Sequence, residues 1–213
     1  NVHFSPEELE AAVSEAARFG VPVAAHAHAT EGIRMAVEAG VRSIEHGTYI
    51  DTETMDLMAE RGTFLVPTLY VGDVLGEEDS NYREKALNIA FKQQEQADLL
   101  ARMGEAHRRG VRIAAGVDLG GYHHDPTESA REVAALIKAG LPPMAAIKSA
   151  TSTGADLLNM THQVGRLAEG SFADIIAIPG NPLVDISVLE QVAFVMKGGD
   201  IIKQATGDER PSD

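Results

Sequence analysis

The chain has 213 residues and a formal net charge of −14, and it contains no Cys. Its length fits one large domain or two small ones. The acidic balance argues against a nucleic-acid-binding protein and against binding to an anionic membrane surface, since both functions need clustered Lys and Arg. The absence of Cys excludes disulfides, thiolate nucleophiles and Cys-type zinc sites.

The sequence contains no stretch of about 20 apolar residues, which a membrane-spanning helix requires. Its first ten residues, NVHFSPEELE, lack the basic region and the apolar run of a signal peptide. We therefore expect no membrane association. A cytoplasmic location is favoured, although a chain without Cys folds in either redox environment.

The first part of the chain alternates short apolar segments with helical ones. Ser5 and Pro6 predict the start of a helix that ends before Gly20, because Ser caps helix N-termini and Pro fits the first turn. Buried strands are predicted over residues 21–25, 41–44, 63–66 and 111–115. The further predicted helices span residues 30–38, 51–61, 81–109 and 126–139, and one or two more span residues 142–160. This alternation indicates an α/β fold with a parallel sheet, either a barrel or a doubly wound sheet.

The pattern changes after residue 160. Strand-like pieces are predicted over residues 164–167, 173–178 and 192–196, and Gly and Pro mark the turns between them. We predict an antiparallel β element over residues 163–204, followed by a frayed tail. The sequence thus predicts an α/β part over residues 1–162 and a β part over residues 163–213.

Ionisable side chains lie where the predicted strands end. His26 and His28 end the first strand, His46 ends the second and Asp118 ends the fourth. Because the carboxyl ends of parallel strands meet at one rim, we expect these side chains to converge. Two imidazoles and a carboxylate are suitable zinc ligands that leave a position open for water, and an adjacent Asp can take the proton of that water. A lone His is often structural, but several at one rim favour a metal site.

The other histidines carry less information. His3, His107 and His162 fall on predicted surface or helix positions, and we interpret them as structural. His123 and His124 follow Asp118 in the next loop, where substrate contact and a solvated pair are equally consistent with the sequence. Of the two, His124 is the candidate that we name for substrate binding.

Three sequence runs resemble the amidohydrolase superfamily, in the branch of imidazolonepropionase-like hydrolases and Xaa-Pro dipeptidases. PVAAHAHATEGIRMAVEAGVRSIEHGTYID is similar to the fifth and sixth strands of that family. AAGVDLGG resembles the eighth strand with its metal-binding Asp, although many relatives have Thr where this chain has Val117. VGRLAEGSFADIIAIPGNPL resembles the segment that returns to a small β-sandwich.

The resemblance implies a (β/α)8 TIM barrel, of which this chain supplies about four β/α units, and a C-terminal β element that belongs to a β-sandwich. It implies that His26, His46 and Asp118 are metal ligands, that Asp118 is also the proton shuttle, and that His28 lies near the substrate. Side chains alternate along a strand, so His26 and His28 share a face, and their spacing leaves open which of them is the ligand.

The chain departs from the family pattern in one large respect. The family's H-x-H after strand one and its carboxylated Lys after strand four have no counterpart here, nor does the N-terminal part of the sandwich. The resemblance therefore implies a C-terminal half whose partner is an N-terminal half of the barrel. We expect this chain alone to be inactive.

Our leading hypothesis is a metal-dependent hydrolase of C–N bonds that acts on an amide, a dipeptide or a cyclic amide. Zinc is the expected metal, with one or two divalent cations in the intact enzyme, and a homo-oligomer is expected. The alternative is a non-catalytic or truncated relative that needs a partner half. A carbon–carbon lyase with a Schiff-base Lys is a weak third reading, because its best candidate, Lys148, lies in a predicted helix.

Overall fold

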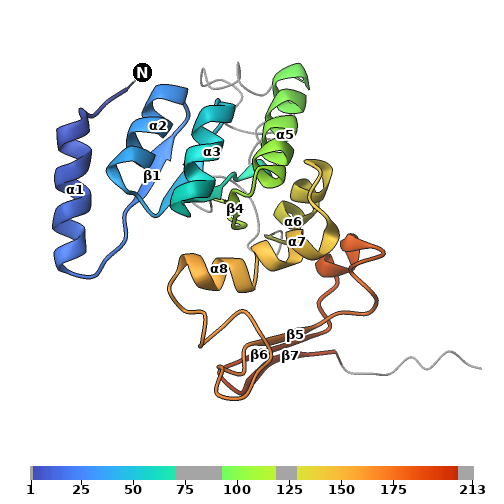
Figure 1. The fold of residues 1–213 in the computed structure, drawn as a ribbon. Helices are drawn as coiled ribbons and strands as arrows, with labels where there is room; N and C mark the ends of the chain where they lie inside the picture. Colours follow the sequence, from blue (N-terminus) through green and yellow to red (C-terminus); the bar gives the residue numbers. More distant parts are fainter. Residues whose placement is uncertain (1, 71–92, 119–128, 206–213) are drawn as a thin grey trace, which may run out of the picture.

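A computed structural model describes residues 2–70, 93–118 and 129–205 (Figure 1). His123 and His124, with the rest of the predicted loop after Asp118, lie outside the described residues, and so does the predicted tail at residues 207–213. The described ranges contain two separate sheets, one parallel and one antiparallel.

The parallel sheet has four short strands in the order β1-β2-β3-β4. They are β1 (Ala24–Ala27), β2 (Ser43–His46), β3 (Phe64–Val66) and β4 (Arg112–Ile113). Each strand pairs in parallel with the next one along the chain, so the order never reverses. A doubly wound sheet contains a reversal, whereas a (β/α)8 barrel adds its strands in sequence. The sheet is therefore a barrel segment of four β/α units, as predicted.

Seven described helices accompany this sheet, and α1, α2 and α3 stand side by side along it (Figure 1). Their bounds are α1 (Pro6–Arg18), α2 (Thr30–Ala39), α3 (Thr52–Arg61), α5 (Gln93–Arg108), α6 (Ser129–Lys138), α7 (Pro143–Ser149) and α8 (Ser152–Leu157). The predicted start of α1 is confirmed: Ser5 Oγ accepts a hydrogen bond from the Glu8 N–H, and Glu8 Oε2 accepts one from the Ser5 N–H. This reciprocal pair is a capping box, which satisfies two N–H groups that the helix leaves free.

The two faces of the parallel sheet differ in their packing. Ile44, Leu65 and Ile113 point to the helices and belong to a large aliphatic core. The next residues along the strands point to the other face, where Phe64 and Val66 form only a small cluster with Ala114 and Leu157. In a barrel this sparsely filled face is the inner one. The strands are therefore held mainly by packing against the helices, and few apolar side chains fill the inner face of the sheet.

Two arginines and one carboxylate tie α8 to the amino-terminal end of the sheet. The guanidinium groups of Arg42 and Arg112 lie over the Phe64 ring, at 4.7 and 4.1 Å from its centre. Both also donate to Asp156 of α8. This cluster closes the end of the sheet that lies opposite the strand carboxyl ends.

The antiparallel sheet has the order β5-β6-β7, and a single turn of 3₁₀-helix lies between its first two strands. The elements are β5 (Ile175–Ala177), η3 (Ile186–Glu190), β6 (Phe194–Lys197) and β7 (Asp200–Gln204). Its predicted antiparallel character is confirmed. The division of the chain into domains at residues 162 and 163 stays a prediction.

The structure refines one predicted element after residue 140 and contradicts another. Of the one or two helices predicted over residues 142–160 there are two, because Thr151 between them has a non-helical backbone (φ −127°, ψ −98°). The strand predicted over residues 164–167 is absent. Gly165 has a φ of +80° there, and a Cβ at this position would lie 2.6 Å from the Thr151 carbonyl oxygen. The chain turns tightly against α8 at this glycine rather than extending as a strand.

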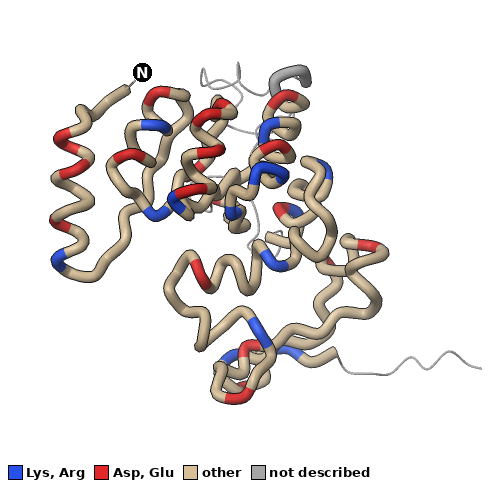
Figure 2. Tube along the Cα trace, viewed as in Figure 1, with Lys and Arg blue, Asp and Glu red and all other residues tan. Residues whose placement is uncertain are grey.

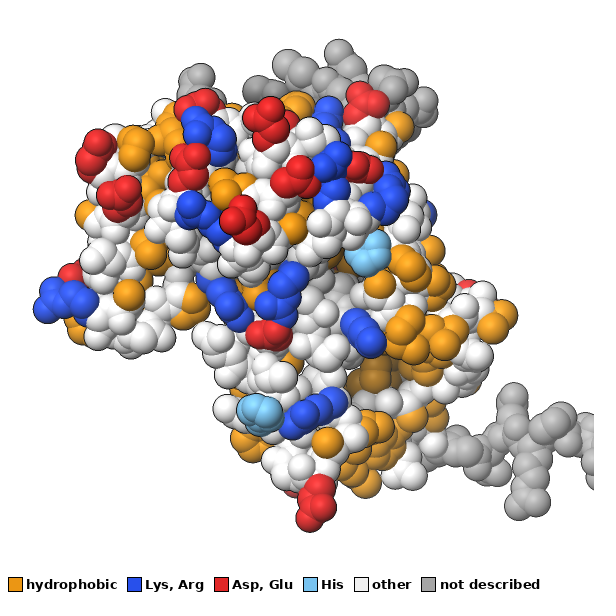
Figure 3. All heavy atoms as spheres, viewed as in Figure 1, with side chains coloured by type: hydrophobic (Ala, Val, Ile, Leu, Met, Phe, Trp, Pro, Cys, Tyr) orange, Lys and Arg blue, Asp and Glu red, His pale blue; other side chains and the backbone are white. Residues whose placement is uncertain are grey.

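Charged and apolar side chains are distributed unevenly over the surface. Acidic and basic residues are interspersed along the helices (Figure 2). On the face drawn in Figure 3, hydrophobic side chains gather on the lower part of the molecule, where the antiparallel sheet lies. Among the described helices, none is both long and apolar enough to cross a membrane.

Candidate metal centre

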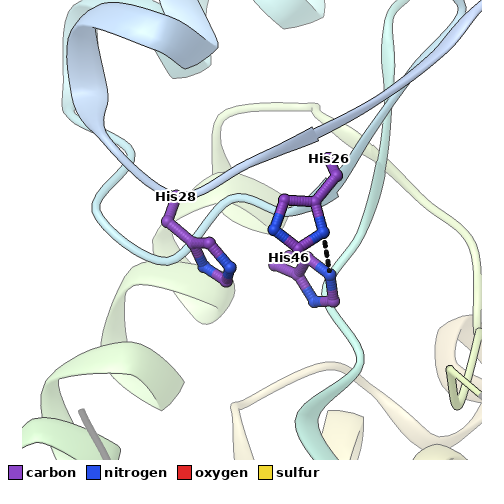
Figure 4. A group of neighbouring side chains, drawn as sticks. All are labelled: His26, His28 and His46. Atoms are coloured by element: carbon purple, nitrogen blue, oxygen red, sulfur yellow. Dashed lines mark hydrogen bonds between the residues drawn. The ribbon is translucent and has the colours of Figure 1, made fainter. Parts of the chain in front are cut away.

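Three imidazoles meet at the carboxyl ends of β1 and β2 (Figure 4). His26 lies in β1, His28 directly follows it, and His46 is the last residue of β2. Their ring centres are 4.5 to 4.8 Å apart, and one ring nitrogen from each lies within 4.8 Å of the others. The predicted convergence of strand ends therefore holds for all three histidines.

The backbone of His46 explains how its ring reaches this cluster. His46 pairs in register with Ala27, which contacts the aliphatic core on the outer face. Strict alternation along β2 would therefore direct His46 to the outer face as well. Its φ is +71°, a left-handed value, and this turn places its Nε2 3.1 Å from the Nδ1 of His26. Alternation alone would not have brought the two rings together.

Two threonine hydroxyls form hydrogen bonds with the Nδ1 atoms of His28 and His46. The Nδ1 of His28 lies 2.8 Å from the Oγ1 of Thr48, and the Nδ1 of His46 lies 2.6 Å from the Oγ1 of Thr68. The sequence analysis missed both threonines. Each lies two residues after the last residue of a parallel strand, β2 or β3, and this position is the signal that could have found them.

The environment favours the neutral form of two of the imidazoles, those of His28 and His46. The pKa of His46 is lowered to about 4, mainly by burial and also by the neighbouring His28 and His26, while Asp118 opposes the shift. Burial and His26 also lower the pKa of His28. A neutral imidazole has a free lone pair, which is the form that binds a metal ion.

Asp118 lies near the histidines, and its negative charge helps to raise the pKa of the neighbouring Glu45 carboxyl group. Burial raises the pKa of Glu45, a hydrogen bond from Ser43 opposes this shift, and the negative charge of Asp118 adds to it. Asp118 is exposed and has a φ of +51°. Its carboxylate therefore stands in solvent at the same rim as His46 and Glu45.

The donor set fits a divalent metal such as zinc. Two ligands at about 2.0–2.1 Å from a tetrahedral zinc lie about 3.3 Å apart. The nitrogens of His26 and His46 that face each other are 3.1 Å apart. Imidazole nitrogen is also a ligand type that zinc accepts, and the group of neighbouring ligand atoms consists of the three histidines without Asp118. The described residues thus hold at least two nitrogens at the spacing of a metal site.

A cavity of about 680 Å³ adjoins the cluster between the N-terminal segment, α1 and β1. His26, His28 and Tyr49 line one end of it, and His3 and Phe4 line the other. His3, which we interpreted as structural from the sequence, therefore faces the same space as the clustered histidines. Lys148, the candidate Schiff-base residue of the carbon–carbon lyase reading, is exposed on α7 and does not line this cavity.

Comparison with known proteins decides the family. The model of the amidohydrolase family matches residues 1–202. The chain belongs to the amidohydrolase family. This confirms the superfamily that the strand-end motifs predicted, and with it the barrel architecture.

Several relatives are similar over nearly the whole chain. Ochratoxinase from Aspergillus niger is 38% identical over 208 residues, which is 94% of this chain and 42% of that protein. An uncharacterized protein of Mycobacterium tuberculosis is 30% identical over 92% of this chain and 52% of its own length. A crystal structure of a Xaa-Pro dipeptidase with bound methionine in its active site has a TM-score of 0.86 and 39% identity, over 95% of this chain and 50% of that one. The chain thus spans about half the length of these relatives.

Proposed function

We propose that this chain supplies the C-terminal half of a metal-dependent hydrolase that cleaves C–N bonds in small molecules or dipeptides. The observation that carries the proposal is the cluster of three imidazoles at one rim, with the His26 and His46 nitrogens 3.1 Å apart. Two named relatives, an ochratoxinase and a Xaa-Pro dipeptidase, support a hydrolytic function.

In this proposal His26 and His46 hold a divalent cation, zinc, and Asp118 is its third ligand from this chain. When bound, such a cation polarises a carbonyl group and makes a water molecule more acidic. His26 and His46 suit this role because both are histidines of the rim cluster and their facing nitrogens have the spacing of two ligands on one ion.

Asp118 performs the proton transfers. Water adds to the carbonyl carbon, and the Asp118 carboxylate accepts the proton that the water loses. The C–N bond then breaks, and Asp118 passes this proton to the leaving nitrogen, so that the products are a carboxylic acid and an amine. The exposed position of Asp118 at the rim allows it to reach both water and substrate.

His28 contacts the substrate in this account. Its ring lies 4.7 Å from that of His26 and lines the adjoining cavity. Thr48 engages its Nδ1, so its Nε2 is the nitrogen left to meet a polar group of the substrate. His124, the other residue predicted to bind substrate, keeps that role as a prediction.

The remaining half of the barrel is the proposed partner. The described sheet has four strands, whereas a closed barrel of this type has eight. The chain also matches only 42–52% of the relatives named above. We therefore propose that residues 1–162 are the second half of the barrel and that residues 163–213 contribute to a β-sandwich.

The test is hydrolysis by the intact protein that carries this chain. After zinc loading it is assayed with dipeptides and cyclic amides, then treated with a chelator and reloaded. We expect activity that the chelator removes and zinc restores, and its loss in His46→Ala but not in His162→Ala, an exposed histidine elsewhere. Activity that survives both chelation and His46→Ala would overturn the proposal. No turnover by zinc-loaded wild type would favour the non-catalytic alternative.

A further inference from the structure

We propose that Thr68 is a positioning residue that fixes the tautomer of His46, and that the buried Glu132 holds Thr68 in place. This inference rests on the proposed function in one respect: the fixed tautomer matters for metal binding only if His46 is a metal ligand. The relay runs from α6, through the segment after β3, to the end of β2. It is carried by four hydrogen bonds.

The first step concerns the single hydrogen of the Thr68 hydroxyl. Thr68 Oγ1 lies 2.8 Å from the Pro67 carbonyl oxygen and 2.6 Å from His46 Nδ1. A carbonyl oxygen can only accept, so the hydroxyl donates its one hydrogen to Pro67. Its contact with His46 must then run the other way, with Nδ1–H donating to Oγ1. His46 is therefore protonated on Nδ1, and its Nε2 carries the free lone pair.

The direction of that lone pair matters for the site. His46 Nε2 faces His26 Nδ1 at 3.1 Å, which is the gap that a shared cation would occupy. Metal-binding histidines commonly donate their other N–H to a protein acceptor, and this contact fixes the tautomer and the ring orientation. Thr68 supplies such an acceptor to His46.

The second step is the backbone of Thr68 itself. Its φ is +51°, and a β-branched residue in the left-handed region is strained. Such a conformation persists only when its surroundings impose it. Thr68 is 8% exposed, so packing accounts for part of the constraint. The segment that follows it accounts for the rest.

Glu132 provides that second constraint. It lies on α6 and is 0% exposed, and it is the one acidic or basic residue among the fully described ones that is buried. Its Oε1 accepts from the Leu69 N–H at 3.0 Å, and its Oε2 accepts from the Tyr70 N–H at 2.7 Å. Burying a carboxylate is costly unless it is hydrogen-bonded, and here both oxygens bind the two residues directly after Thr68.

The relay is tested first in the metal-free intact protein labelled with ¹⁵N-histidine. Spectra at about pH 8, above the ordinary His pKa of about 6.5, report which ring nitrogen carries the hydrogen. We expect His46 to be protonated on Nδ1 in wild type and in Thr68→Ser. Thr68→Val keeps the shape but not the oxygen, and it should give a mixture of tautomers. Thr48→Ala, which removes the hydroxyl beside His28, is the matched control and should leave His46 unchanged.

Zinc affinity, measured by competition with a chelator, gives the second readout. Thr68→Val should weaken binding by about 10–100-fold, the usual effect of removing a residue that orients a ligand, and Thr68→Ser should restore most of it. A wild-type His46 protonated on Nε2, or a Thr68→Val protein with wild-type tautomer and affinity, would overturn the inference. Because the tautomer is read without metal, a protein that binds no zinc would contradict the proposed function and leave this readout intact.

The role of Glu132 has its own measurements. Glu132→Gln replaces one acceptor oxygen by an NH₂ group, so it should weaken zinc binding less than Thr68→Val does. Hydrogen exchange in wild type covers the case in which this variant fails to fold. The Leu69 and Tyr70 amides should exchange slowly. Fast exchange of both amides, or a folded Glu132→Gln with unchanged zinc affinity, would overturn the role of Glu132.

Discussion

His46, Thr68 and Asp118 share an unusual backbone feature. Each has a positive φ, of 71°, 51° and 51° respectively, and each follows or ends a parallel strand. Left-handed values are uncommon for residues other than Gly and cost free energy. All three lie at the candidate metal centre or contact it, so the strain coincides with the proposed chemistry. The left-handed turn at His46 brings a ring to the inner rim that alternation would have directed outward.

Asp118→Asn in the intact protein tests the role of one such residue. Asn keeps the size of the side chain and tolerates a positive φ, but it cannot take a proton. Activity should fall by about 10²–10⁴-fold, while the melting temperature of the metal-free protein barely changes, because Asp118 is exposed. Parallel kinetic and thermal-unfolding measurements check this. A comparable loss of stability and activity would make Asp118 structural.

The sequence predicted the histidines of the site but not the groups that hold them. His26, His28 and His46 stand at the ends of predicted strands, which meet at one rim, but the left-handed turn that brings the His46 ring inward could not be predicted. Thr68 could not be predicted, because its role depends on a left-handed φ and on its contact with a strand 22 residues earlier in the chain. Glu132 could not be predicted either, since its partners are backbone N–H groups.

Helices α5 and α6 approach each other closely at one glycine. A Cβ on Gly104 would lie 2.1 Å from the Ala139 carbonyl oxygen, which is far inside contact distance. The long helix α5 therefore needs a residue without a side chain where it crosses the end of α6. This contact helps to position α6 and with it Glu132.

Gly104→Ala should lower the free energy of unfolding by at least about 1 kcal/mol, because overpacking against backbone outweighs the better helix propensity of Ala. Gly32→Ala in α2 is the matched control: its Cβ would meet no described atom within 4 Å, so its stability should be unchanged or higher. Chemical denaturation of the intact protein measures both. Equal effects of the two substitutions would mean that α5 and α6 are not in close contact.

The link between α8 and the sheet should depend on pH. Hydrogen bonds from Arg112, and the charges of Arg112 and Arg42, lower the pKa of Asp156 below its ordinary value of 3.8. A lowered pKa in the folded state means that the carboxylate stabilises the protein above about pH 4. That stabilisation is lost as the pH falls through the lowered value.

We therefore expect Asp156→Asn to lower the melting temperature at pH values above about 5, and the gap to wild type to close toward pH 3. The gap should be modest, because the Asp156 side chain is 36% exposed and solvent screens it. Thermal unfolding of both proteins across this pH range is the measurement. A gap that stays constant or widens in acid would show that the ion pairs do not stabilise the fold.

Secondary structure was predictable where local signals agreed with packing. The capping box at Ser5 and Glu8 sets the start of α1, and the apolar runs mark where the parallel strands lie along the chain. The position of the helix break at Thr151 and the missing strand at residues 164–167 were not predictable. They depend on the contact of Gly165 with Thr151, which is a tertiary contact.

The described structure leaves two kinds of surface uncovered: apolar side chains, and the polar backbone groups of edge strands. In the described sheet β1 and β4 are edge strands, and the inner-face residue His26 is exposed. Large apolar side chains on the antiparallel sheet are also exposed, with Ile176 at 55% and Ile202 at 67%. Unpaired edges and apolar patches favour association with another chain. The proposed N-terminal half would cover such surfaces.

Residues 1–213 expressed alone should therefore have little or no hydrolase activity and should self-associate. The isolated chain contains the proposed ligands His26, His46 and Asp118 but not the other half of the rim. Light scattering and the hydrolysis assay, run beside the intact protein, check both expectations. Full activity from the isolated chain would refute the half-site account.

The alternation of elements alone limits the architecture to a choice between two folds, and the family resemblance predicts the barrel. Alternating strands and helices allowed either a barrel or a doubly wound sheet, and the observed strand order decided for the barrel. Residue spacing cannot give this order, because it depends on which strands pair in space. The homo-oligomer and the cytoplasmic location stay predictions.

The most direct test of the account is the metal content of the intact protein. His26→Ala and His46→Ala remove the two nitrogens that lie 3.1 Å apart, whereas His162→Ala removes an exposed imidazole that contacts Arg166. After zinc loading and dialysis, elemental analysis should show that His26→Ala and His46→Ala each lose at least one equivalent of metal relative to wild type, and that His162→Ala loses none. Wild-type metal content in both His26→Ala and His46→Ala would contradict the account.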